Sequence, residues 1–165
     1  MTLQEYLDSI HGKTVAVVGI GVSNTPLIRL LLREGIAVTA CDKRTREQLG
    51  ELAGELEQGG ARLQLGSDYL EGLDQDIIFR TPGLRPDVPQ LAKAVAGGSV
   101  LTSEMEVFFQ VCPCPIIAVT GSDGKTTTTT IIAELLKKAG RTVRESSGAA
   151  EPFALPVHQI GRAHV

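Results

Sequence analysis

The sequence predicts an α/β protein in which a parallel β-sheet domain is followed by the start of a second, nucleotide-binding domain. Short apolar segments alternate with helical patterns, which is typical of βαβ units. Two glycine-rich turns, at residues 19–24 and 121–127, each follow an apolar segment and precede a helical pattern. Between them, Cys112-Pro113-Cys114-Pro115 cannot continue a helix and predicts a hinge. We therefore expect domains at residues 1–112 and 113–165.

Length, composition and charge are those of an ordinary globular protein. The 165 residues are 42% hydrophobic and 21% charged, enough to bury a core. The net charge of −3 and an aromatic content of 4% do not favour nucleic acid or an anionic membrane as partners. The three cysteines are an odd number, and Cys112 and Cys114 are too close for an easy bridge, which indicates a reducing compartment. The start of the chain, from Met1 to His11, carries Glu5 and Asp8 and no long apolar run, so we expect neither a signal peptide nor a membrane span there. We expect a cytoplasmic protein and a monomer.

The first half of the chain predicts a short helix followed by a complete βαβ unit. The apolar residues of the first helix recur at helical spacing from Leu3 to Ile10. A buried strand is predicted over Thr14–Val18, a helix from Pro26 through Leu32, and a second strand over Ile36–Cys41. This unit is of the dinucleotide-binding type, so the first domain is predicted to be Rossmann-like.

The rest of the chain continues the alternation. Helices are predicted over residues 45–58, 88–95, 103–111 and 125–139, and strands over residues 62–65, 76–79 and 99–101. The helix at 103–111 begins with a capping-box pattern at Ser103. The apolar run from Pro115 to Val119 is predicted as a strand that enters the second turn.

The first turn, Gly19-Ile20-Gly21-Val22-Ser23-Asn24, is a degenerate form of the dinucleotide fingerprint. Asn24 replaces the third glycine of that pattern, which makes a dinucleotide less favoured than a nucleoside diphosphate. Asp42 ends the second strand, where an acidic residue can read a ribose. A structural turn without ligand remains an alternative, as does an NAD-dependent oxidoreductase, which would leave the second turn without a role.

The second turn has the plan of a phosphate-binding loop, in a compact form. Val119 stands where the common pattern has its first glycine. In such a loop, glycine backbone N–H groups and the following helix N-terminus face a polyphosphate. The residues expected to face this polyphosphate are Gly121, Ser122, Asp123, Gly124, Lys125, Thr126 and Thr127. Lys125 would bring a mobile positive charge to the terminal phosphates, and Thr126 would be a ligand of Mg²⁺. The alternative is a surface turn that begins a helix.

The segment Thr120–Thr127 resembles the ATP loop of the Mur ligase family. The turn at 19–24 and Thr81-Pro82-Gly83, taken together with the second loop, resemble the loops of one member of that family. This member joins D-glutamate to UDP-N-acetylmuramoyl-L-alanine. The resemblance covers residues 1 to about 143. It implies an ATP- and Mg²⁺-dependent ligase of peptidoglycan synthesis, and so of cell wall biogenesis, that works through an acyl phosphate.

The resemblance also implies a set of residues that bind the uridine diphosphate of the substrate. These are Gly19, Ser23, Asn24, Asp42, Lys43, Arg44, Thr81, Pro82 and Gly83. For Lys43 and Arg44, a solvated pair of cations after a strand is an equally good interpretation, and Arg80 is undecided in the same way. Another ligase of the superfamily, such as a folyl-polyglutamate synthetase, would share the ATP loop but not need the first βαβ unit.

The tail departs from the family pattern, which continues with a strand and a Gly-Asn loop. We expect the sequence from about residue 144 not to be native and the second domain to be truncated. If the chain is truncated in this way, we expect an inactive fragment that binds at most the UDP moiety. Such a fragment would in effect be a nucleotide-binding module.

Overall fold

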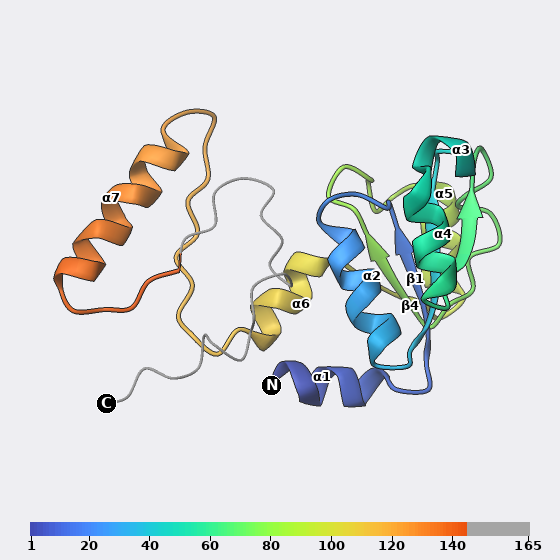
Figure 1. Cartoon of the computed structure of the whole chain (residues 1–165), viewed down its shortest axis with the longest axis horizontal. Coiled ribbons are helices and arrows are strands. Elements are labelled where there is room, and N and C mark those ends of the chain that lie inside the picture. The colour runs from blue at the N-terminus through green and yellow to red at the C-terminus, as the bar shows by residue number, and fades with distance from the viewer. Residues whose placement is uncertain (145–165) are drawn as a thin grey trace.

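The structure, a computed structural model, describes residues 1–144, and five parallel strands form one sheet within these residues (Figure 1). The order across the sheet is β3-β2-β1-β4-β5. The strands are β1 (Thr14–Val18), β2 (Ala37–Asp42), β3 (Arg62–Leu65), β4 (Ile77–Arg80) and β5 (Val100–Thr102). Because all four pairings are parallel, the carboxyl ends of the strands meet at one edge of the sheet. The predicted α/β fold class is confirmed.

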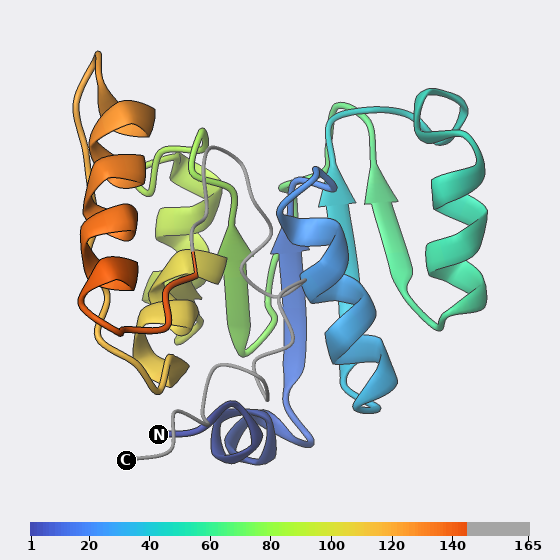
Figure 2. The ribbon, with the colours of Figure 1, turned by 60° about the vertical axis from the view of Figure 1, so that its left-hand side comes forward.

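Helices connect the strands and cover both faces of the sheet (Figure 2). These helices are α1 (Leu3–Ile10), α2 (Asn24–Arg33), α3 (Arg46–Leu49), α4 (Glu51–Gln58), α5 (Pro89–Ala96) and α6 (Glu104–Val111), and a further helix, α7 (Lys125–Lys138), follows them in the chain. The continuous helix predicted over residues 45–58 is wrong, because Gly50 adopts φ +60° and separates α3 from α4. The helix start at Ser103 is confirmed, since its Oγ accepts the N–H of Glu106 at 3.3 Å.

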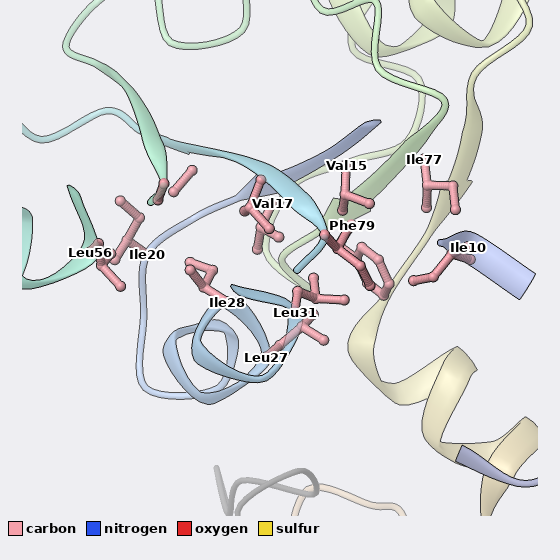
Figure 3. Packing of buried hydrophobic residues seen from close by; sticks show 14 of the residues in the cluster. Ile10, Val15, Val17, Ile20, Leu27, Ile28, Leu31, Leu56, Ile77 and Phe79 are labelled. Carbon is pink, nitrogen blue, oxygen red and sulfur yellow. The ribbon is translucent and has the colours of Figure 1, made fainter. Parts of the chain in front are cut away.

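The larger part of the core lies on the face of the sheet that α1, α2, α4 and α6 cover. Val15 and Val17 of β1 and Phe79 of β4 are fully buried there. Figure 3 shows these side chains packed against Ile28 and Leu31 of α2. Successive side chains of a strand point to opposite faces, so every second residue of β1 belongs to this layer.

The alternate residues of the same strands form the second layer. Ala16 and Val18 of β1 and Ile78 of β4 pack with Leu91 of α5. The segment that leads into β4 adds two further buried leucines, Leu70 and Leu73. A central strand that is buried on both faces must be apolar throughout, which explains the unbroken Val15–Val18 run.

The strand predicted over Pro115–Val119 is wrong. These residues adopt no regular structure, and the side chains of Ile116 and Ile117 are 41% and 60% exposed. A strand forms only by pairing, and no strand of the described part of the chain pairs with this segment. The segment leads to α7, which lies outside the layers around the sheet (Figure 1). Across residues 1–144, every helix is too short or too polar to cross a membrane.

Candidate functional site

The carboxyl edge of the sheet gathers the loops that follow β1, β2 and β4. The register pairs Val18, the last residue of β1, with Cys41 on one side and Arg80 on the other. The strand order reverses between β1 and β4, since the chain runs from β1 outwards to β3 and then returns to β4. In open parallel sheets, ligands bind in the crevice at such a reversal. The three segments predicted to bind the uridine diphosphate therefore leave the sheet at one edge.

The turn after β1 requires glycine at its first position. Gly19 has φ +93°, and its N–H donates to the carbonyl of Cys41 at 2.7 Å. A Cβ added to Gly19 would lie 3.1 Å from the Cβ of Thr81, closer than ordinary packing allows. Thr81 in turn donates its N–H to the carbonyl of Val18 at 3.1 Å. Two of the predicted binding loops are thus in direct contact.

Asn24 holds this turn closed from inside. Its side chain is buried, and its Nδ2 donates to the carbonyls of Val18 at 3.2 Å and Gly19 at 2.9 Å. An amide therefore satisfies two carbonyls where the standard fingerprint has a third glycine. Ser23 stands before the first turn of α2, and its hydroxyl makes no capping hydrogen bond to the helix. The positive end of the α2 dipole and this hydroxyl both lie at the carboxyl edge of the sheet.

Asp42 is the electrostatic centre of the region. Its Oδ2 accepts the N–H of Ile20 at 2.7 Å, and its Oδ1 accepts the N–H of Arg44 at 2.9 Å. The Arg44 guanidinium donates to the same carboxylate, with Nε 3.0 Å from Oδ1 and Nη2 2.9 Å from Oδ2. Burial on its own would raise the pKa of Asp42, but the hydrogen bonds from Arg44 and Ile20 outweigh it and lower the pKa. Asp42 is therefore a carboxylate at neutral pH.

Arg44 spans from β2 to the first turn. Besides its bonds to Asp42, its Nη2 donates to the carbonyl of Ile20. The Arg44 side chain remains 41% exposed, whereas that of Asp42 is 8% exposed. Lys43, between them, is exposed. Of the two cations, Lys43 thus faces solvent while Arg44 is tied to the turn.

Arg80 is a residue of this region that the sequence left undecided. Its Nη1 donates to the carbonyl of Leu84 at 3.2 Å, and the N–H of Leu84 donates to the carbonyl of Thr81 at 3.0 Å. Arg80 thereby supports the turn that contains Thr81-Pro82-Gly83. The signal that could have identified it is a basic residue at the carboxyl end of a strand, immediately before a Pro-Gly turn.

The second loop has the backbone that its glycines predict. Gly121 and Gly124 adopt φ +151° and +71°, and Gly124 is the residue before α7. The Nζ of Lys125 reaches back over the loop and donates to the carbonyls of Gly121 and Ser122, the latter at 3.1 Å. The first turn of α7 carries no acidic residue. Positive charge and a helix N-terminus therefore meet at one exposed loop, which suits a polyphosphate.

Hydroxyl groups line the start of α7. Thr126 and Thr127 are exposed, while Thr129 donates its Oγ1 hydrogen to the carbonyl of Lys125 at 2.8 Å, inside its own helix. In the run of threonines at residues 126–130, the hydroxyl of Thr129 thus bonds to the backbone of the helix. Residues 1–144 contain no cluster of three His, Cys, Asp or Glu side chains that could hold a metal ion alone. A single hydroxyl beside phosphates is a donor set that suits Mg²⁺.

The sequence of this chain is similar to those of known ligases. The model of the Mur ligase middle domain matches residues 119–153, which include the second loop and α7. A UDP-N-acetylmuramoylalanine–D-glutamate ligase of Clostridium botulinum is 46% identical over 162 residues, or 98% of this chain and 35% of the relative. The ligase of the same name from Ruminiclostridium cellulolyticum is 53% identical over 139 residues, or 84% of this chain and 30% of the relative. The chain thus spans about a third of the length of these curated relatives.

Solved structures of related ligases share the fold. A murein peptide ligase from Psychrobacter arcticus superposes with a TM-score of 0.52 at 25% identity, over 78% of this chain and 27% of that one. A UDP-N-acetylmuramate-alanine ligase from Thermotoga maritima gives a TM-score of 0.50 at 24% identity, over 78% of this chain and 30% of that one. Because the sequence also matches curated ligases along nearly its whole length, this chain belongs to the Mur ligase family.

Proposed function

We propose that this chain contributes the substrate-nucleotide site and the ATP loop of a ligase that adds D-glutamate to UDP-N-acetylmuramoyl-L-alanine. One observation carries the proposal: the loops after β1, β2 and β4 meet at the carboxyl edge of the sheet, in a chain 46% identical to a ligase of that name. The domain boundary would lie between residues 112 and 113. Substrates of this kind, a nucleotide-linked sugar and ATP, argue for a cytoplasmic protein.

The uridine diphosphate would bind across the first site. Ser23, with its uncapped hydroxyl, and the N-terminus of α2 would receive the diphosphate. Gly19 allows the close approach of backbone that such a ligand needs. The remaining contacts would come from Asn24, Asp42, Lys43, Arg44, Thr81, Pro82 and Gly83. Among these, Asn24 and Asp42 already hold the turn after β1, so their main effect on ligand binding would come from the shape that they give to this turn.

ATP would bind the second loop, from Gly121 to Thr127. In the structure Lys125 lies across the loop and donates to two of its carbonyls. When ATP binds, Lys125 would exchange these hydrogen bonds for contacts with the phosphates. Mg²⁺ would be held by the Thr126 hydroxyl together with phosphate oxygens, and it would neutralise charge on the transferred group. Ser122, Asp123 and Thr127 complete the loop.

The reaction would proceed in two balanced steps. The substrate carboxylate attacks the terminal phosphorus of ATP, which gives an acyl phosphate and ADP. The amine of D-glutamate then attacks the acyl carbon, and inorganic phosphate leaves as the nitrogen gives up a proton and the amide forms. Lys125 would stabilise the negative charge that develops during the first step.

Calorimetric titration of the chain with UDP-N-acetylmuramoyl-L-alanine, and separately with NAD, tests the first site. We expect binding of the uridine ligand and no response to NAD. The substitution Lys43→Ala should weaken binding of the uridine ligand, because it removes an exposed cation next to the diphosphate. The matched control Lys93→Ala, an exposed lysine on α5, should leave binding unchanged.

Two results would contradict the proposal. Binding of NAD without binding of the uridine ligand would indicate an oxidoreductase. A folded chain that binds neither would mean that the turn after β1 is structural. For the second site, a Lys125→Ala variant that binds ATP as tightly as wild type would show that Lys125 does not contact the phosphates.

A further inference from the structure

Two cysteines stand close together on the segment that joins α6 to the ATP loop. The Sγ atoms of Cys112 and Cys114 are 3.3 Å apart, and both residues are free thiols. Cys112 is the C-cap of α6, where its N–H donates to the carbonyl of Phe108 at 2.9 Å. Both side chains are partly exposed, whereas the third cysteine, Cys41, is buried. Neither nucleotide site uses this pair.

The backbone holds the two thiols in this arrangement. Cys112 is extended, with φ −68° and ψ 119°, as expected for a residue before proline. Pro113 has its own φ restricted to about −65° by its ring. A disulfide bond of about 2.05 Å would need the two sulfur atoms to approach by about a further 1.2 Å. The spacing in the sequence predicts a strained bridge, but the fold already brings the two sulfur atoms to 3.3 Å, so this bridge is within reach although it is not an unstrained one.

We propose that Cys112 and Cys114 are an oxidation site, at which a low-molecular-weight disulfide such as glutathione disulfide converts the two thiols into an intramolecular disulfide. One thiolate attacks a sulfur of glutathione disulfide, which gives a mixed disulfide and releases one glutathione. The second thiol loses its proton and attacks the protein sulfur of the mixed disulfide, which releases the second glutathione. Two protein thiols are oxidised, and one glutathione disulfide is reduced.

The environment of Cys114 disfavours its thiolate. Partial burial and the hydrogen bond with Cys112 raise the pKa of the Cys114 thiol. Since the thiolate is the nucleophile, this shift slows an attack that begins at the Cys114 sulfur. Cys41 takes no part, because burial raises the pKa of its thiol to about 12.

The bridge would be reversible and would act on the link between α6 and the ATP loop. A ring that encloses only Pro113 restricts the unfolded chain very little, so it gains little stability from loop closure. Small or strained disulfides are the easily reduced, regulatory ones. The pair therefore stays reduced in a reducing compartment and closes only as the glutathione pool becomes oxidised. Closure would stiffen the backbone just ahead of residues 121–127.

Redox titration of the purified chain tests the proposal. The chain is equilibrated with glutathione mixtures of increasing disulfide content, blocked with N-ethylmaleimide and analysed by intact mass and peptide mapping. We expect a loss of two hydrogen atoms and loss of label from the peptide that contains Cys112 and Cys114. The control Cys41→Ala should behave in the same way, whereas Cys112→Ser and Cys114→Ser should each take up one glutathione instead.

A second measurement separates positioning by the fold from mere proximity in sequence. The same equilibrium is measured in denaturing urea, with circular dichroism to verify that the untreated chain is folded. The folded chain should form the bridge with an equilibrium constant at least about tenfold above that of the denatured chain. Equal constants would overturn the proposal, and so would stable glutathione adducts on both cysteines of the folded chain.

Discussion

Asp42 shows how one carboxylate organises the carboxyl edge of the sheet. It accepts a backbone N–H from Ile20 in the turn after β1 and a bidentate pair from Arg44 after β2. Charge-assisted hydrogen bonds of this kind are stronger than neutral ones and hold a fixed geometry. The acidic residue at the end of β2 therefore has a structural role in addition to any contact with a ligand.

The substitution Asp42→Asn should destabilise the chain by about 1–3 kcal/mol, because it removes the charged acceptor from a buried network. Hydrogen bonds lower the pKa of Asp42, so its contribution is present above the unfolded-state pKa of about 3.9 and is lost as the pH falls through the lower folded-state value. Urea unfolding at neutral pH and near pH 3 measures both. The difference between wild type and variant should shrink at the acidic pH, and a constant difference would contradict this account.

Gly19 is a second residue whose role is argued from geometry. The substitution Gly19→Ala combines a positive φ of +93° with a Cβ 3.1 Å from Thr81. We expect a loss of about 2–3 kcal/mol in the free energy of unfolding.

The matched control is Gly54→Ala, in the middle of α4. The space around its added Cβ is open and its φ is not positive, so the helix should gain about 0.5–1 kcal/mol. Urea unfolding of both variants measures the contrast. A Gly19→Ala variant as stable as wild type would mean that Gly19 does not lie against Thr81.

At the scale of elements, α7 differs from the helices that cover the sheet. Ile131 and Leu135 are 55% and 61% exposed, and Ala133 is the one buried residue of this helix. In contrast, α2 buries Leu27, Ile28 and Leu31 against the sheet. A helix of this length without tertiary packing is marginal in water.

Amide hydrogen exchange should therefore distinguish the two helices. We expect the amides of α7 to exchange by local opening and those of α2 to exchange only through unfolding of the sheet domain. Mass spectrometry of peptides from each helix gives the measurement. Equal protection would contradict the picture of α7 as a weakly covered helix.

The elements that the sequence predicts well are those with a local cause. Thr14–Val18 and Arg62–Leu65 are strands with the predicted bounds, because both segments have pairing partners in the sheet. Pro115–Val119 has a similar composition and is not a strand, since pairing is a non-local property that composition does not report. Gly50 divides the helix predicted over residues 45–58 for a local reason, because its backbone conformation interrupts the polar helical pattern around it.

The candidate site divides in the same way. The turns at Gly19 and Gly124 are predictable, because a positive φ selects glycine. The bonds of Asn24 to the turn that it ends and of Arg80 to Leu84 are not, since they depend on where a side chain points after the chain has folded. Motif spacing identifies the loops, whereas the division of labour within them appears only in the structure.

At the scale of the whole molecule, ionisable groups tie the elements together and limit the pH range of stability. On the acidic side, the pKa values of Asp42, Glu55 and Asp76 are all lowered. Asp76 accepts both the N–H and the hydroxyl of Thr14, at 2.7 Å each, and so joins the start of β4 to that of β1. Carboxylates with lowered pKa values stabilise the fold above their unfolded-state values and stop doing so as they are protonated.

On the alkaline side, burial raises the pKa of Tyr6 and of Cys41, each to about 12. Both groups are neutral when protonated, so their contribution is complete below the unfolded-state values and is lost as the pH rises towards 12. The free energy of unfolding should therefore be highest between about pH 5 and 8 and fall on both sides.

The substitution Tyr6→Phe isolates the alkaline part of this prediction. It removes a titrating hydroxyl from α1 while it keeps the ring, so the variant should match wild type near neutral pH and lose less stability above about pH 10. Urea unfolding across the pH range measures both chains. An identical alkaline decline in the two would mean that the Tyr6 hydroxyl is solvated, and that α1 packs less closely against the core than the structure has it.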